Sequence, residues 1–217
     1  MRMKNTDSTS WQQKRPEVFW AEISPCEHLI QIYEDDDAFL NSLEAFVHAG
    51  IQSEEVTIVI ATPPHLAALE SRLRLAGLDL DAALASDLYI PLDATKALEK
   101  FMVYGTPDKI LFNRFITGLI ERAAGRRIRA FGEMVALLWG QGFKNATVKL
   151  EELWNSFCHS GAFCLFCAYP KIGFEQDAKL SIDEICHKHS MVVAGWSQPA
   201  ADHVYYKNRA EQNSEVA

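Results

Sequence analysis

The run EVTIVIAT at residues 55–62 constrains the fold of this chain more than any other stretch. It is a nearly continuous series of β-branched residues, which is typical of a strand that is buried on both faces of a parallel sheet. Neighbouring parallel strands are joined by crossover helices, so strands and helices must alternate along the chain. The rest of the sequence can therefore be tested for that alternation.

Strand-like and helix-like segments do alternate on both sides of this run. Short apolar segments predict strands at 28–34, 87–93, 127–133, 162–170 and 191–195. Apolar residues three or four apart predict helices at 38–50, 63–77, 94–104, 108–125, 134–142, 144–158 and 181–190, the last with Ser181 and Glu184 at capping-box spacing. We predict an α/β fold of three layers, a mostly parallel sheet with helices on both faces.

The two ends of the chain differ from this folded part. Residues 1–17 and 197–217 are largely polar and lack periodicity, so they cannot bury enough apolar surface to offset the loss of chain entropy. We predict a flexible arm over 1–17, a single folded domain over 18–196 and a flexible tail over 197–217.

Composition restricts the partners and the compartment. The formal net charge of −8 argues against nucleic-acid binding, because a DNA-binding surface needs cations that displace counterions from phosphates. Five cysteines are an odd number without the spacing of a disulfide framework, which indicates reduced thiols and a cytoplasmic protein. No apolar run approaches the ~20 residues of a membrane helix. We expect neither a direct nucleic-acid partner nor a membrane contact.

The common motifs of catalysis do not occur. The loop after the 55–62 run reads ATPPHLAAL, where two prolines lack the amide hydrogen, no glycine is present and no Lys-Ser or Lys-Thr pair follows. A P-loop cannot be built from these residues. The chain also has no Gly-x-Ser-x-Gly elbow and no His-Glu-x-x-His pair. We predict a non-catalytic protein without a cofactor.

One pattern raises the question of a zinc site. Cys164 and Cys167 have CxxC spacing, and Cys186, His187 and His189 lie downstream. Residues three apart on a strand point to opposite faces, however, so the two sulfurs cannot bind the same ion. We predict buried structural thiols, two surface histidines and no metal site.

Polar side chains in apolar surroundings are the candidates for a ligand site at the carboxyl ends of the strands. They are His28, Tyr33, Arg129, Glu133, Glu152, Asn155 and Tyr169. Glu133 is predicted to pair with Arg129 or to accept a hydrogen bond from a ligand, and the two tyrosines to supply ring surface with one hydrogen bond each. Glu151 is predicted to lie on a solvated helix face, since neighbours on a helix diverge.

Several short motifs resemble a known family when they are taken in order. They are HLIQIY at 28–33, GIQSEEVTIVI at 50–60, RAFGEM at 129–134, LEELWNSF at 150–157 and CLFCAYP at 164–170. Together they look like the MEDS domain, the sensory domain of methanogens, methylotrophs and the dichloromethane-responsive regulator DcmR. The likeness covers about residues 26–190.

The resemblance implies a RecA-like or KaiC-like α/β core that has lost its phosphate loop and senses small organic compounds, such as hydrocarbon derivatives. It implies partners of the histidine kinase or transcription regulator class, and a homo-oligomer by analogy with RecA-like folds. The family's motif positions are occupied here by His28, Tyr33, Arg129, Glu133, Met134, Glu152, Asn155 and Tyr169.

Two alternatives to a small-molecule sensor stay open from the sequence. One is a degenerate RecA-like or KaiC-like protein that still binds ATP. The other is a protein-interaction module that needs no ligand.

Overall fold

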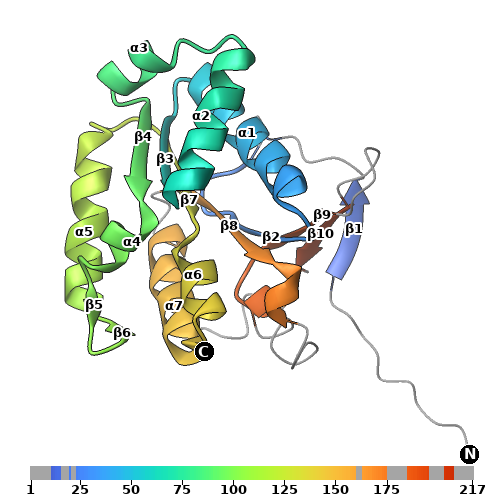
Figure 1. Ribbon diagram of the computed structural model, residues 1–217, viewed down its shortest axis with the longest axis vertical. Coiled ribbons are helices and arrows are strands. Elements are labelled where there is room, and N and C mark those ends of the chain that lie inside the picture. Colours follow the sequence, from blue (N-terminus) through green and yellow to red (C-terminus); the bar gives the residue numbers. More distant parts are fainter. Residues whose placement is uncertain are drawn as a thin grey trace, which may run out of the picture.

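A computed structural model describes residues 11–15, 20, 23–159, 163–174, 185–195 and 203–207. The main sheet has eight strands in the order β1-β10-β9-β2-β8-β7-β3-β4, with helices on both of its faces (Figure 1). Its strands are β1 (Trp11–Arg15), β2 (His28–Tyr33), β3 (Val56–Ala61), β4 (Tyr89–Asp93), β7 (Ile128–Gly132), β8 (Cys164–Pro170), β9 (Met191–Gly195) and β10 (His203–Lys207). The helices are α1 (Asp36–Gln52), α2 (Pro63–Leu75), α3 (Leu80–Ala85), α4 (Ala94–Leu98), α5 (Lys109–Arg122), α6 (Met134–Gly140) and α7 (Lys144–His159).

The six strands from β9 to β4 pair in parallel, whereas β10 pairs antiparallel with both β9 and β1. Helices α1, α2 and α3 pack on one face of this sheet, and α4 to α7 pack on the other. The prediction of a three-layer α/β fold with a mostly parallel sheet is therefore confirmed.

The central strands are apolar on both faces because each face supports its own core. All six residues of β3 are buried. Val59 packs in the core under α1 and α2, whereas Ile58 and Ile60 pack in the core under α5 and α7. The same alternation separates Cys164 from Cys167, which lie in opposite cores. This separation confirms the argument that these two sulfurs cannot share an ion.

Aspartates start four of the helices. The side chains of Asp35, Asp79, Asp93 and Asp108 accept hydrogen bonds from amides in the first turns of α1, α3, α4 and α5. Helix α2 begins differently, since Thr62 makes no side-chain cap and Pro63 and Pro64 follow it. Its first turn therefore has few amide hydrogens to offer a ligand.

Three segments differ from the predicted secondary structure. The helix predicted at 94–104 ends at Leu98 and is followed by a hairpin of β5 (Met102–Val103) and β6 (Thr106–Pro107), turned by Tyr104 and Gly105 at positive φ. Helix α3 was not predicted, because six residues are too few to show a helical period. Of the helix predicted at 181–190, residues 185–187 are helical and 181–184 lie outside the described residues.

The sheet also includes parts of both terminal segments. Strand β1 lies in the segment 1–17 and β10 lies in the segment 197–217, both predicted to be flexible. They pair with each other, and β10 pairs with β9. This pairing joins residues from opposite ends of the chain, which local periodicity does not reveal. No helix among the described residues is long and apolar enough to cross a bilayer.

Candidate functional site

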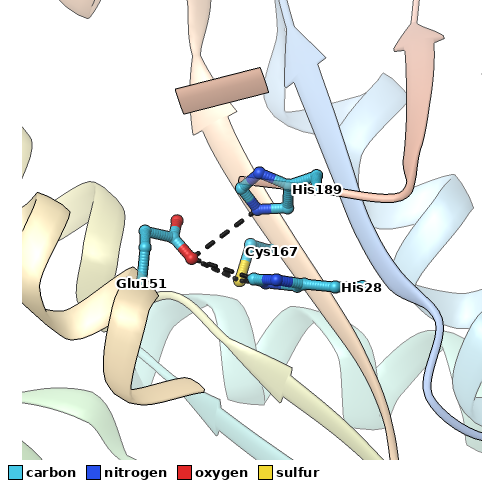
Figure 2. A group of neighbouring side chains, drawn as sticks. All are labelled: His28, Glu151, Cys167 and His189. Atoms are coloured by element: carbon cyan, nitrogen blue, oxygen red, sulfur yellow. Dashed lines mark hydrogen bonds and ion pairs between the residues drawn. The ribbon is translucent and has the colours of Figure 1, made fainter. Parts of the chain in front are cut away.

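Four side chains that can bind metal ions or protons converge between the sheet and α7 (Figure 2). His28 comes from β2, Glu151 from α7, Cys167 from β8, and His189 from the segment just before β9. One nitrogen, oxygen or sulfur atom of each lies within 4.8 Å of those of the others. All four residues are buried. We call this set the buried cluster.

The fold brings these residues together through ordinary periodicity. His28 and Ile30 share a face of β2, and Ile30 is the register partner of Cys167 on the adjacent strand. On α7, the buried positions Thr147, Glu151 and Trp154 are spaced four and three residues apart. Glu151 is therefore on the inward stripe of its helix, directly over β2 and β8.

The atoms at the centre of the buried cluster are closely spaced. Oε2 of Glu151 lies 3.4 Å from Nε2 of His28, 3.6 Å from Nε2 of His189 and 3.9 Å from Sγ of Cys167. Nε2 of His28 lies 3.5 Å from that sulfur, and the two imidazole rings are 4.0 Å apart between centroids. Figure 2 shows that all four groups point at one another.

Further polar groups hold the outer sides of the cluster. The Tyr169 hydroxyl donates to Oε1 of Glu151. Oδ1 of Asn155 accepts from Nδ1 of His28 at 2.8 Å. Nδ1 of His189 donates to the carbonyl oxygen of Ile185 at 2.7 Å. Each bond fixes one side of its partner and leaves the inward atom facing the centre.

Burial governs the protonation of the cluster. It raises the pKa of Glu151 to about 7, against the hydrogen bond from Tyr169, which lowers it. Burial lowers the pKa of His189 well below its ordinary value, and the neighbouring His28 adds to this shift. Burial likewise raises the pKa of the Cys167 thiol. Without a bound cation, the neutral forms of the imidazole and the thiol are favoured.

A second polar group lies at the carboxyl edge of the sheet, beyond β3 and β7. The Glu133 carboxylate accepts from the backbone N–H of Thr62 at 2.7 Å, from the Thr62 hydroxyl at 3.4 Å and from Nδ1 of His65 at 2.8 Å. Tyr33, at the end of β2, stacks on Phe39 with 4.9 Å between ring centroids, and Phe39 contacts the edge of His65. We call Tyr33, Thr62, His65 and Glu133 the edge cluster.

Both ionisable rings of the edge cluster have shifted pKa values. Burial raises the pKa of Tyr33, and the negative charges of Glu133 and Asp36 raise it further. The hydrogen bond to Glu133 raises the pKa of His65, although partial burial opposes this shift. Asp36 lies 4.0 Å from Nε2 of His65 on its other side. The imidazolium form of His65 is therefore favoured between two carboxylates.

The ends of β2 and β3 are poorly suited to phosphate. After β3, the Thr62 amide already bonds the chain's own carboxylate, and Pro63 and Pro64 have no amide hydrogen. After β2, residues 34–37 are Glu-Asp-Asp-Asp, which repel an anion.

The structure divides the predicted site residues among several places. His28, Asn155 and Tyr169 meet at the buried cluster, while Tyr33 and Glu133 meet at the edge cluster. Met134 is fully buried in the core, and Glu152 is exposed beside Lys188, 3.3 Å away.

Arg129 lies near the amino end of β7, away from Glu133 at the other end. Its guanidinium bonds Glu55 and the carbonyl oxygen of Trp20. The predicted pairing of Arg129 with Glu133 is therefore wrong, because the two residues are at opposite edges of a parallel sheet.

Two predictions about single residues are also wrong. Glu151 was predicted on a solvated face but is fully buried, and His189 was predicted on the surface but is only 2% exposed, while His187 is exposed. The sequence holds a signal for Glu151, since Thr147, Glu151, Trp154 and Cys158 follow helical spacing. No such signal exists for His189, whose neighbours Glu151 and His28 are remote in sequence.

Solved structures share this fold. The uncharacterized protein PH0321 from Pyrococcus horikoshii, in complex with an unknown peptide, has a TM-score of 0.56 at 11% identity, over 84% of this chain and 82% of that chain. Protein PH0250 from P. horikoshii OT3 has a TM-score of 0.54 at 8% identity, over 82% and 86%. The KaiC-like protein PH0186 from the same organism has a TM-score of 0.53 at 12% identity, over 82% and 76%. The fold is thus that of α/β proteins with a KaiC-like core.

The family follows from the sequence profile. The profile of MEDS, the MEthanogen/methylotroph, DcmR Sensory domain, matches residues 27–190, which include both clusters. The chain belongs to the MEDS family of sensory domains. No curated protein matches the sequence.

Proposed function

We propose that this chain is a non-catalytic sensor that binds a small organic ligand at the edge cluster and passes the signal to a partner kinase or transcription regulator. Membership of a sensory family supports the class of function. The Glu133 carboxylate is the observation that supports this location of the binding site. It is nearly buried beyond the ends of β3 and β7, and it accepts hydrogen bonds from Thr62 and His65. Open parallel sheets bind their ligands at this edge.

The edge cluster has the chemistry of a small-molecule site. The stacked rings of Tyr33 and Phe39 offer apolar surface, and Glu133 and His65 offer directional hydrogen bonds. His65 keeps 18% of its side chain exposed, so it can be reached from solvent. These features favour a compact, largely apolar molecule with one hydroxyl or amino group that donates to Glu133.

The edge cluster is also connected to helices α1 and α2. Asp36 is in the first turn of α1 and His65 is in the first turn of α2, and the His65 ring lies between the carboxylates of Asp36 and Glu133. A ligand that binds better when α1 and α2 have one spacing shifts the population toward that spacing. A partner that contacts these helices would then read the change.

The test is thermal unfolding in the presence of a panel of small alcohols, amines and halogenated hydrocarbons. A true ligand at about 100 times its Kd stabilises the folded state by about 2.7 kcal/mol, or roughly 5–11 °C in Tm for a domain of this size. Tyr33→Phe and Glu133→Gln should abolish the shift. Tyr89→Phe, another buried tyrosine on β4, is the matched control and should keep it.

Two results would count against this function. If no compound of the panel raises Tm in the wild type, the edge cluster is not a ligand site of this class. If MgATP raises Tm and the effect depends on Glu133, the protein binds nucleotide in spite of the acidic loop at 34–37. Co-purification of a kinase or regulator without any ligand would favour an interaction module instead.

A further inference from the structure

The centre of the buried cluster holds four atoms with lone pairs and few hydrogens to share among them. Hydrogen bonds to the surrounding protein determine which atoms of the two histidines carry a hydrogen. The positions of these hydrogens do not depend on the proposed function.

The tautomer of His28 is set through Asn155. Nδ2 of Asn155 donates to the carbonyl oxygen of Lys188 at 2.9 Å, and a carbonyl oxygen can only accept, so the amide orientation is fixed. Oδ1 of Asn155 therefore faces His28 and accepts from Nδ1. The neutral ring of His28 must then present the lone pair of Nε2 to the centre.

The tautomer of His189 follows in the same way. Its Nδ1 lies 2.7 Å from the carbonyl oxygen of Ile185, so Nδ1 carries the hydrogen. Its Nε2 is buried and has no hydrogen-bond partner within the described part of the chain. A buried acceptor in this state is destabilising unless something else satisfies it.

The few hydrogens of the centre do not satisfy all of its acceptors at the distances observed. The centre offers lone pairs from Nε2 of His28, Nε2 of His189, Oε2 of Glu151 and Sγ of Cys167. A protonated carboxyl and a thiol supply at most two hydrogens for these atoms. The separations that involve Glu151 are 3.4, 3.6 and 3.9 Å, and those of the two nitrogens exceed the 2.7–3.2 Å of a good hydrogen bond.

We propose that the buried cluster binds one divalent transition-metal ion, with Zn²⁺ the ion that its ligands suit best. Two imidazoles, a thiolate and a carboxylate are the donor types that zinc takes in proteins. The Cys167 thiol and the Glu151 carboxyl release their protons to solvent when the ion binds, since both must be deprotonated. The two negative charges then balance the two positive charges of the ion in the core.

Four of the six separations among these atoms are close to those around a tetrahedral ion. Zinc–ligand bonds of about 2.0–2.3 Å at a tetrahedral angle separate a nitrogen from an oxygen by about 3.3 Å, and a sulfur from either by about 3.5 Å. The nitrogen–oxygen distances are 3.4 and 3.6 Å, and the sulfur lies 3.5 Å from Nε2 of His28 and 3.9 Å from Oε2 of Glu151. The two other separations, from Nε2 of His189 to Nε2 of His28 and to Sγ of Cys167, are within 4.8 Å.

The outer hydrogen bonds are those that metal ligands usually make. Metal-bound histidines donate their other ring N–H to a carboxylate, a carbonyl or an amide, as His28 does to Asn155 and His189 does to Ile185. The Tyr169 hydroxyl holds the carboxylate oxygen that faces away from the centre. These partners pre-set the orientation of three of the four ligands.

This set is different from the CxxC pattern that the strand geometry excludes. Only Cys167 of that pair takes part, and Cys164 lies in the core on the other face of β8. The chain therefore contains its own control: a second buried cysteine on the same strand that cannot reach the ion.

The experiment titrates the metal-free full-length protein with Zn²⁺ in competition with a chromophoric chelator. We expect one equivalent to bind. Cys167→Ser and His189→Gln should lose most of the affinity, Tyr169→Phe should weaken it about 10–100-fold through the lost outer hydrogen bond, and Cys164→Ser should leave it unchanged.

A second measurement does not depend on the folding of the variants. Wild-type protein titrated with Co²⁺ should show a thiolate-to-cobalt charge-transfer band and the intense visible bands of a tetrahedral ion. Cys164→Ser should keep this spectrum. Failure of the wild type to bind one equivalent of Zn²⁺, a Co²⁺ spectrum without the thiolate band, or an equal loss in Cys164→Ser would each overturn the proposal.

Discussion

Replacement of Arg129 by methionine tests what this buried cation does. Its side chain is 1% exposed, Nε bonds the Glu55 carboxylate, and Nη1 donates to the carbonyl oxygens of Trp20 and Phe46. Arg129→Met keeps the apolar stem but leaves Glu55 buried at 3% exposure. Breaking one partner of a buried pair costs about 3–5 kcal/mol, because the other charge remains in the core.

Arg127 supplies a matched control for this loss. It is on the same stretch and its guanidinium lies 3.1 Å from the same carboxylate, but 60% of its side chain is exposed. Solvent screening reduces such a pair to about 0–1 kcal/mol, so Arg127→Met should change stability little. Arg129→Met/Glu55→Gln should lose less than the sum of the two single variants, since the two residues interact.

Urea unfolding measures these differences, and thermal unfolding repeats them. A loss of 3–5 kcal/mol corresponds to a fall of roughly 6–20 °C in Tm for a chain of this size. If Arg129→Met costs no more than Arg127→Met, the pair does not stabilise the sheet. If Arg129→Met is stable but abolishes binding of an edge-cluster ligand, Arg129 acts on the ligand as the family resemblance implies.

Further predictions concern a close contact and a titration. Gly50→Ala should lower the free energy of unfolding in urea by about 1–3 kcal/mol, because an added Cβ would lie 2.5 Å from the Thr57 hydroxyl. Gly118→Ala is the control: its added Cβ has nothing within 4 Å, so it should be neutral or stabilising by up to about 1 kcal/mol. Equal losses in the two variants would refute the close contact at Gly50. His65 contributes stability through Glu133 while it is protonated in the folded state, so this contribution is complete below the ordinary pKa of about 6.5 and is lost as the pH rises through the raised folded pKa. The Tm difference between wild type and His65→Gln should therefore shrink from pH 6 to pH 8, and a constant difference would contradict the assignment.

The sequence was sufficient for the layers of the fold. A run such as 55–62 is buried on both faces whatever its neighbours are, so its apolar residues alone indicate a central parallel strand. The opposite positions of Cys164 and Cys167 followed from the strand period. Strands β1 and β10 were not predicted, because neither segment shows the period of a strand by itself, and β1 pairs with residues at the other end of the chain.

The buried cluster could not be assembled from the sequence for a related reason. A glutamate on a helix is most often solvated, and Glu151 is buried because the inward stripe of α7 faces His28, Cys167 and His189, which come from other elements. The motif positions included His28, Asn155 and Tyr169, which surround the centre, but not the three other residues that complete it. The spacing of residues within one helix or strand cannot reveal a site whose residues come from four different segments of the chain.

Strand β2 joins the two clusters end to end, because His28 opens it and Tyr33 closes it. At about 3.3 Å per residue, five steps put the Cα atoms of His28 and Tyr33 about 17 Å apart on one strand. If a ligand at one end favours a different position of this strand, the affinity at the other end changes, and linkage makes the change equal in both directions. The concentrations of the metal ion and of the ligand would then both control the position of strand β2.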